Sequence, residues 1–243
     1  MARDPSRNEH AAPSIRQLTG SDEYALAGGE PVEAVRLLGR LLPEGALDRM
    51  SLSEIDRALA ALHLSLYGAK ADCRARCPAC GEGFEFSVDL IDVQTAQDAE
   101  RPGPPDADGA WTLEDGRRVR APRLSDLGGD GALSDRLLVD GEPGGDGQAV
   151  EALLERAAPV LALDLATRCP HCETEGEARF DIAAYLARRL AGERPFLVRE
   201  THLIASRYGW PHDQILALNR EDRRAYAGLI EAERANAQRR WSA

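Results

Sequence analysis

Two short cysteine motifs constrain the fold of this chain more than any other feature. Cys77-Pro78-Ala79-Cys80 and Cys169-Pro170-His171-Cys172 share the pattern Cys-Pro-x-Cys, and each leads into alternating apolar residues that indicate a strand. A gap of two residues lets one tight turn present two sulfurs to one ion, and zinc prefers four soft ligands in a tetrahedron. The motifs therefore predict a zinc ribbon with one ion and four ligands: Cys77, Cys80, Cys169 and Cys172.

The expected site is structural, because four thiolates fill the zinc shell and leave no position for a substrate. The two motifs lie about four times farther apart than is usual in a zinc ribbon. Residues 81–168 must therefore leave the ribbon, form structure of their own and return to it.

Other uses of paired cysteines stay open. Disulfides would suit a secreted protein, but no signal peptide is visible. A thioredoxin-like motif has one Cys-x-x-Cys that opens a helix, whereas strands follow both motifs here. An iron–sulfur cluster uses the same four thiolates. The fifth cysteine, Cys73, is expected on the strand that enters the first motif, as a buried or spare thiol or as a replacement for Cys77 at a less usual spacing.

The charge of the chain bears on its partners. The 243 residues carry a formal net charge of −11, which opposes nucleic acid and anionic membranes as partners. No apolar run is long enough to span a bilayer. With no visible export signal and paired cysteines, we expect the protein in the reducing cytoplasm.

Helices are expected before the first motif. Residues 1–30 are predicted to be mostly disordered, and Pro31 suits the first turn of a helix that Pro43 ends. Ser51 and Glu54 form a capping box for a second helix, which Gly68 ends. The apolar stripe of this helix predicts a core face rather than a groove for a partner. Its members are Leu52, Ile55, Leu59, Leu62 and Leu66.

The segment between the motifs is mixed. Residues 101–109 indicate an exposed loop, and Asp115-Gly116 predicts a hairpin with a two-residue turn. Residues 121–147 are rich in glycine and are expected to form flexible loops, since they lack the Gly-Lys-Ser/Thr of a phosphate-binding loop. A helix is predicted at about 148–157, and a further helix follows the second half of the ribbon at 182–190.

The remaining chain indicates helices from Pro195 to Gly209, through 211–218 and over about 220–237. Arg220, Arg223 and Arg224 are expected on a solvated face of mixed charge rather than in a basic patch. The predicted fold is α+β, a zinc ribbon with a long insertion and helical segments at both ends. Its expected divisions are 1–30, 31–68, 69–192 and 193–243.

No catalytic motif was found. The five histidines form no metalloprotease pair, and Gly-x-Ser-x-Gly and nucleotide-binding glycine motifs are absent. His171 is expected to be exposed, and His202 is expected to be partly buried within a helix. The sequence therefore predicts a protein that is not an enzyme.

The order of motifs resembles a known family over about residues 45–232. The matching segments are Leu64–Gly68, the first Cys-Pro-x-Cys, Phe84–Leu90, Trp111–Arg120, Ala162–Leu165, the second Cys-Pro-x-Cys, Phe180–Ala183, Glu200–Ala205, Tyr208-Gly209-Trp210, Ile215–Leu218 and Arg223–Tyr226. Together they resemble the baseplate hub assembly chaperone family of T-even-type phages, in the form found in bacterial contractile injection systems.

The resemblance implies a non-enzymatic role in assembling the baseplate hub of a phage-tail-like particle. Expected partners are hub, spike or other injection-system proteins, with no small-molecule substrate. The location is the cytoplasm, either apart from or associated with an assembled particle. The family supplies no catalytic residues, and its cysteine positions fall on the four cysteines of the motifs. The alternative from the residues themselves is a zinc-ribbon protein that binds nucleic acid or a transcription complex.

Overall fold

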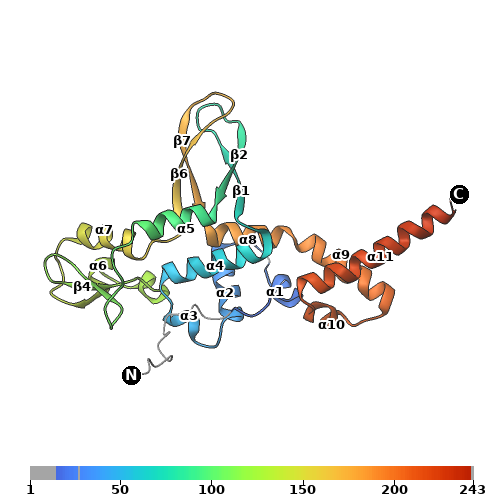
Figure 1. Cartoon of the computed structure of the whole chain (residues 1–243), viewed down its shortest axis with the longest axis horizontal. Helices are drawn as coiled ribbons and strands as arrows, with labels where there is room; N and C mark the ends of the chain where they lie inside the picture. Colours follow the sequence, from blue (N-terminus) through green and yellow to red (C-terminus); the bar gives the residue numbers. More distant parts are fainter. Residues whose placement is uncertain (1–14, 27, 242–243) are drawn as a thin grey trace, which may run out of the picture. The chain divides into compact units, whose positions relative to one another are not determined.

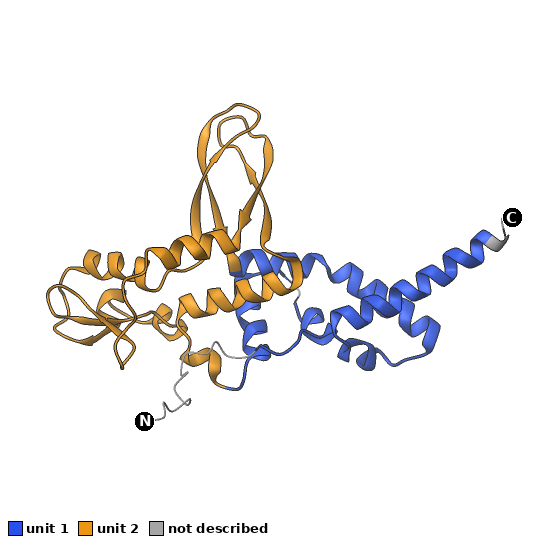
Figure 2. Ribbon diagram, viewed as in Figure 1, with its two compact units in different colours: residues 1–44, 183–243 blue, residues 45–182 orange. Residues whose placement is uncertain are grey.

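The computed structural model describes residues 15–26 and 28–241. Helices alternate with small antiparallel sheets, which confirms the expected mixture of the two (Figure 1). The chain divides into two compact units (Figure 2). Unit 1 comprises residues 1–44 and 183–243, and unit 2 comprises residues 45–182. Of the segment 1–30 that was expected to be mostly disordered, residues 1–14 and 27 fall outside the described residues, whereas residues 20–24 form a helix, so the expectation was wrong there.

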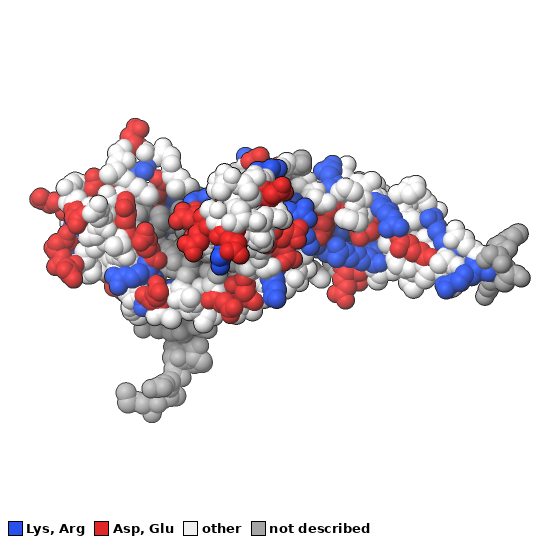
Figure 3. All heavy atoms as spheres, turned by 90° about the horizontal axis from the view of Figure 1, so that it is seen from above, with Lys and Arg blue, Asp and Glu red and all other residues white. Residues whose placement is uncertain are grey.

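The two units differ in charge. Unit 2 has 14 basic and 27 acidic side chains, so it carries more negative charge than the chain as a whole. On the face that Figure 3 shows, acidic side chains gather over unit 2, and basic side chains are commoner over the C-terminal helices. None of the helices in the described ranges is long and apolar enough to cross a bilayer.

Unit 1 is helical. Its elements are α1 (Gly20–Tyr24), α2 (Pro31–Leu41), α8 (Ile182–Gly192, of which the first residue belongs to unit 2), α9 (Arg194–Tyr208), α10 (His212–Ala217) and α11 (Arg220–Trp241). The helix expected from Pro31 and the three expected after Pro195 are thus confirmed. The predicted helical segment 31–68 is divided between the units after residue 44.

Helices α9, α10 and α11 pack around an apolar cluster formed by Leu203, Ile204, Ile215, Ala227 and Ile230. At its edge the rings of Trp210 and Tyr226 lie 5.1 Å apart, edge to face. One expectation for these helices was wrong, because His202 is exposed rather than partly buried.

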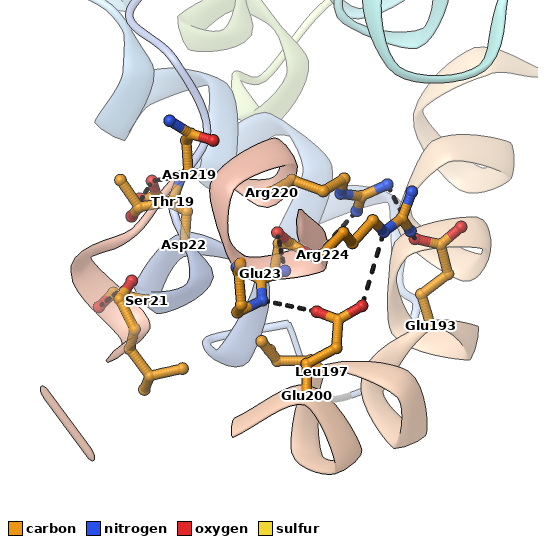
Figure 4. A network of polar contacts seen from close by, with 12 residues as sticks. Thr19, Ser21, Asp22, Glu23, Glu193, Leu197, Glu200, Asn219, Arg220 and Arg224 are labelled. Atoms are coloured by element: carbon orange, nitrogen blue, oxygen red, sulfur yellow. Dashed lines mark hydrogen bonds and ion pairs between the residues drawn. The ribbon is translucent and has the colours of Figure 1, made fainter. Parts of the chain in front are cut away.

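A buried ion network joins α1 to α11 (Figure 4). Glu23 accepts hydrogen bonds from Arg220 Nη2 and Arg223 Nη2, both at 2.9 Å, and all three side chains are buried. Glu200 of α9 accepts from Arg223 Nε at 2.7 Å, and Glu193 pairs with Arg220 at 2.8 Å. The expected solvated face was therefore wrong for Arg220 and Arg223, because acidic partners distant in sequence surround them.

Unit 2 contains two long hairpins and an insertion between them. Its elements are α3 (Ala46–Arg49), α4 (Leu52–Tyr67), β1 (Lys70–Arg76), β2 (Gly83–Asp89), α5 (Leu90–Ala99), β3 (Ala110–Thr112), β4 (Arg118–Arg120), the 3-10 helix η1 (Leu124–Gly128), α6 (Leu133–Arg136), β5 (Leu138–Asp140), α7 (Gly147–Ala157), β6 (Ala162–Arg168) and β7 (Glu175–Asp181). The strands form a β1-β2 sheet, a β3-β4-β5 sheet and a β6-β7 sheet.

Helix α4 begins and ends as its sequence predicts. The backbone N–H of Ser51 donates to Glu54 Oε2 at 2.7 Å, and the Glu54 N–H donates back to Ser51 Oγ at 3.3 Å. Ile55 and Leu59 of the predicted stripe are buried, which confirms a core face. Gly68 ends the helix at a φ of +85°, a conformation that glycine adopts without strain.

The insertion departs from expectation in three places. Helix α5 was not predicted; Asp89 caps it by accepting from the backbone N–H groups of Ile91 and Asp92. The β3-β4 turn has three residues rather than two, because Leu113 N–H bonds to Arg117 O at 2.8 Å. Residues 121–147 are not all loops, since η1, α6 and β5 lie within them.

Candidate metal centre

The two hairpins that carry the cysteines repeat one another. Each has two antiparallel strands of seven residues, β1 with β2 and β6 with β7. At the end away from the cysteine turn, Lys70 pairs with Asp89 in the first hairpin and Ala162 pairs with Asp181 in the second. Every residue of the second hairpin lies 92 positions after its counterpart, as Cys169 lies after Cys77. The expected strand, motif, strand arrangement is confirmed in both halves.

The turns at the hairpin tips are held by equivalent backbone hydrogen bonds. Cys77 N–H donates to Glu82 O at 2.9 Å, and Cys169 N–H donates to Thr174 O at 3.0 Å. The residue after the second cysteine then takes a left-handed conformation, with φ of +75° at Gly81 and +58° at Glu173. This conformation bends each chain back into its second strand and leaves both sulfurs of the turn on one side.

The two tips bring all four motif cysteines together. Their sulfurs lie within 4.8 Å of one another, with Cys77 Sγ 3.6 Å from Cys172 Sγ and Cys80 Sγ 3.8 Å from Cys169 Sγ. Four sulfurs bound tetrahedrally at about 2.3 Å from one zinc ion are separated by about 3.8 Å. The arrangement therefore fits a single metal ion, and these four cysteines are a possible metal site.

The two motifs also agree in which of their cysteines is exposed. Cys77 and Cys169, the first cysteine of each motif, are 2% and 3% exposed, whereas Cys80 and Cys172 face solvent. An ion at this position would be held from the inside by two buried sulfurs and from the outside by two exposed ones. A metal could thus reach the site without opening the unit.

The electrostatics of the cluster favour a cation. Hydrogen bonds from the Thr174 side chain and backbone lower the pKa of Cys172 to about 6. At Cys80 the backbone N–H of Glu82 lowers the pKa, but desolvation and the hydrogen bonds with the other three sulfurs raise it to about 12. The pKa values of Cys172 and Cys80 thus shift in opposite directions, as expected for neighbouring thiols that titrate together, and a bound dication would favour the thiolate form of both.

The other candidate residues lie outside the cluster. His171 is exposed, as expected, and only its backbone N–H approaches a ligand, at 3.4 Å from Cys169 Sγ. Cys73 lies on β1, as expected, and is partly buried. It does not replace Cys77, whose sulfur is part of the cluster.

The outward faces of the hairpins carry cross-strand charge pairs. Arg74 pairs with Glu85 at 2.8 Å on the first hairpin, and Arg179 pairs with Asp164 at 3.2 Å on the second. Residues 70–89 and 162–181 together contain five basic and nine acidic side chains. These two segments therefore carry a net negative charge.

Helix α4 leads into the first hairpin and also binds the segment before the second, a feature that the sequence did not reveal. This helix runs directly into β1, and its first turns also hold the residues that lead into β6. Ser53 Oγ donates to Pro159 O at 2.7 Å, and Asp56 accepts from the backbone N–H of Leu161 at 2.7 Å. Helix propensity and periodicity give no signal for these contacts, because their partners lie more than a hundred positions away.

Comparison with models of known families, with curated proteins and with solved structures finds no match to this chain.

Proposed function

We propose that the four motif cysteines hold one structural zinc ion, and that the protein is a non-enzymatic assembly or structural protein of a contractile-injection baseplate. One observation carries the metal proposal. The sulfurs of Cys80 and Cys169 lie 3.8 Å apart although the two residues are 89 positions apart in the chain. This is the separation of two sulfurs bound tetrahedrally to one zinc ion. The baseplate role is supported by the sequence resemblance.

The proposed ion holds the tips of the two hairpins together. Because four protein ligands complete the zinc shell, the ion serves the fold rather than a reaction. It also closes a chain segment of about ninety residues, whose entropy would otherwise oppose the pairing of the tips. Binding and folding are then coupled, so removal of the ion should separate the tips.

Zinc is preferred to an iron–sulfur cluster on geometric grounds. Both are bound by four thiolates, but a cluster with several irons holds its cysteines farther apart than one ion does. The separations of 3.6 and 3.8 Å suit a single ion. A protein containing iron would be coloured, whereas one containing zinc is colourless, so absorption separates the two.

An assembly role is supported by exposed apolar side chains on the C-terminal helices. Phe196 of α9 and Leu229 of α11 are 58% and 59% exposed. The last turns of α11 that the structure describes are also exposed, and a helix without packing contacts is marginal in water. These surfaces would be stabilised by a protein partner, such as a hub or spike subunit.

The metal proposal is tested by elemental analysis of protein purified without chelator. We expect about one zinc per chain, lost together with cooperative unfolding in Cys77→Ser and in Cys169→Ser, which lie on different hairpins. Cys73→Ser is the matched control and should keep its zinc. Metal retained by both ligand variants, or a brown protein containing iron, would overturn the proposal.

The assembly proposal is tested by co-expressing a tagged chain with the hub and spike proteins of an injection system. We expect co-purification that is lost in Phe196→Glu with Leu229→Glu. Ile91→Glu is the control, since Ile91 is 51% exposed but lies on α5 of unit 2. Zinc-loaded, folded protein that captures no baseplate component would refute the assembly role and leave the metal centre intact.

A further inference from the structure

Unit 2 contains a cavity of about 440 Å³ between the insertion and the start of the second hairpin. A cavity of this volume is in the range that binds drug-sized ligands or a few large side chains. Its apolar walls come from α6, α7 and the segment leading into β6. They include Leu133, Leu137, Val150, Leu154, Val160 and Leu163.

One buried acceptor in the cavity wall lacks a donor. The side-chain amide of Gln97 on α5 is held by a bond from Nε2 to Val160 O at 3.0 Å. Its Oε1 is buried and has no hydrogen-bond partner among the described residues. Because this oxygen is not accessible to solvent, a ligand in the cavity does not contact it, and the missing hydrogen bond is a cost of the fold.

The wall also includes three exposed glutamates. Glu100, Glu151 and Glu155 form no ion pair with any residue in the described ranges. Arg101, which follows Glu100 in the chain, pairs with Asp98, and Arg156, which follows Glu155, is itself part of the cavity wall. By contrast, Asp126 of the insertion accepts two hydrogen bonds from Arg120. The cavity therefore combines apolar walls with three carboxylates and one guanidinium, which leaves a net negative charge.

We propose that this cavity binds a segment of a partner protein in which an apolar side chain is flanked by lysine or arginine. The apolar side chain enters the cavity, and the cations face the three glutamates. Charge selects this occupant: an acidic or neutral segment would leave the glutamates unpaired, in a unit with 27 acidic and 14 basic side chains. The inference rests on the proposed function only in taking the partner to be a protein.

The experiment uses the full zinc-loaded chain and two fluorescein-labelled hexapeptides. One has the sequence Lys-Arg-Trp-Leu-Arg-Lys and the other Glu-Glu-Trp-Leu-Glu-Glu, and binding is followed by anisotropy at low and physiological salt. We expect saturable binding of the basic peptide, weakened at higher salt, and at least tenfold weaker binding of the acidic peptide.

Variants localise the site. Leu133→Asn, at a wall residue that is 39% exposed, should lower the affinity for the basic peptide about tenfold. Glu151→Gln with Glu155→Gln should lower this affinity about fivefold and reduce the dependence of binding on salt. The control is Glu114→Gln with Glu142→Gln, which removes the same charge from exposed positions outside the cavity and should leave binding unchanged.

Equal binding of the two peptides, equal losses in the control, or no saturation at millimolar peptide would overturn the proposed site. Zinc content and co-purification with baseplate proteins are measured on the same variants. If peptide binding fails while both of these persist, the cavity proposal is refuted and the proposed function is not.

Discussion

Replacement of Asp56 by asparagine should stabilise unit 2 at neutral pH and have a smaller effect in acid. Asp56 lies on α4, where its carboxylate accepts the backbone N–H of Leu161. Burial raises its pKa from 3.8 to about 6; the Leu161 N–H opposes the rise, and the nearby Asp181 carboxylate adds to it. The ionised side chain is therefore less favourable in the folded protein than in the unfolded chain.

The pKa values set the size and the sign of the effect. Between pH 3.8 and about 6 the folded protein retains a proton on Asp56 that the unfolded chain releases. The part of the free energy of unfolding that depends on this carboxyl therefore falls as pH rises. The difference between the two pKa values means that ionised Asp56 lowers the free energy of unfolding by about 3 kcal/mol above pH 7. At pH 5 the destabilisation is about half as large. Asparagine carries no charge and retains an oxygen that accepts the Leu161 N–H.

The assay is urea denaturation of wild type and Asp56→Asn from pH 5 to 8 with saturating zinc, so that thiolate protonation affects both proteins equally. We expect the variant to be more stable by about 3 kcal/mol at pH 8 and by about 1.5 kcal/mol at pH 5. Asp56→Ala is the contrast, because it removes the charge and also the acceptor, and should be less stable than Asp56→Asn by about 1–3 kcal/mol. A carboxyl that titrates near pH 4 by carbon NMR, or a difference independent of pH, would refute the reasoning.

Two further predictions concern other parts of the chain. Arg223→Met should cost about 3–5 kcal/mol in the free energy of unfolding by urea, because buried Glu23 loses a partner, whereas half-exposed Arg224→Met should cost less than about 1 kcal/mol; equal losses would contradict the burial argument. At the hairpin tips, Glu173→Gly should raise thermal stability by about 0.5–1 kcal/mol and Gly81→Ala should lower it by about 1 kcal/mol, since both positions have positive φ. Shifts of the same sign, measured by calorimetry, would show that backbone strain does not govern these turns.

The local elements could be predicted because their causes are local. A capping box, a proline at a first helical turn and a terminal glycine defined the limits of α2 and α4. Alternating apolar residues identified the strand that follows each cysteine motif. The insertion was harder to predict, because glycine-rich segments at 128–131 and 141–147 indicate loops while the short elements η1, α6 and β5 depend on their neighbours.

The four metal-site residues also followed from the sequence, because a two-residue spacing within a turn is itself the geometry of a ligand pair. The sequence could not show that the two turns meet, and the structure places their sulfurs within 4.8 Å. The baseplate role stays a prediction from the resemblance.

The sequence by itself determined helices such as α2, α4 and α9, the two hairpins and the identity of the four clustered cysteines, because each is encoded within a few turns or residues of chain. Only the tertiary structure decided which distant groups share an environment. It buried Arg223 between Glu23 and Glu200, and it placed Asp56 against the strand that starts near Leu161. The physical reason is that burial and ion pairing depend on distances through space, which the local pattern of a sequence does not contain.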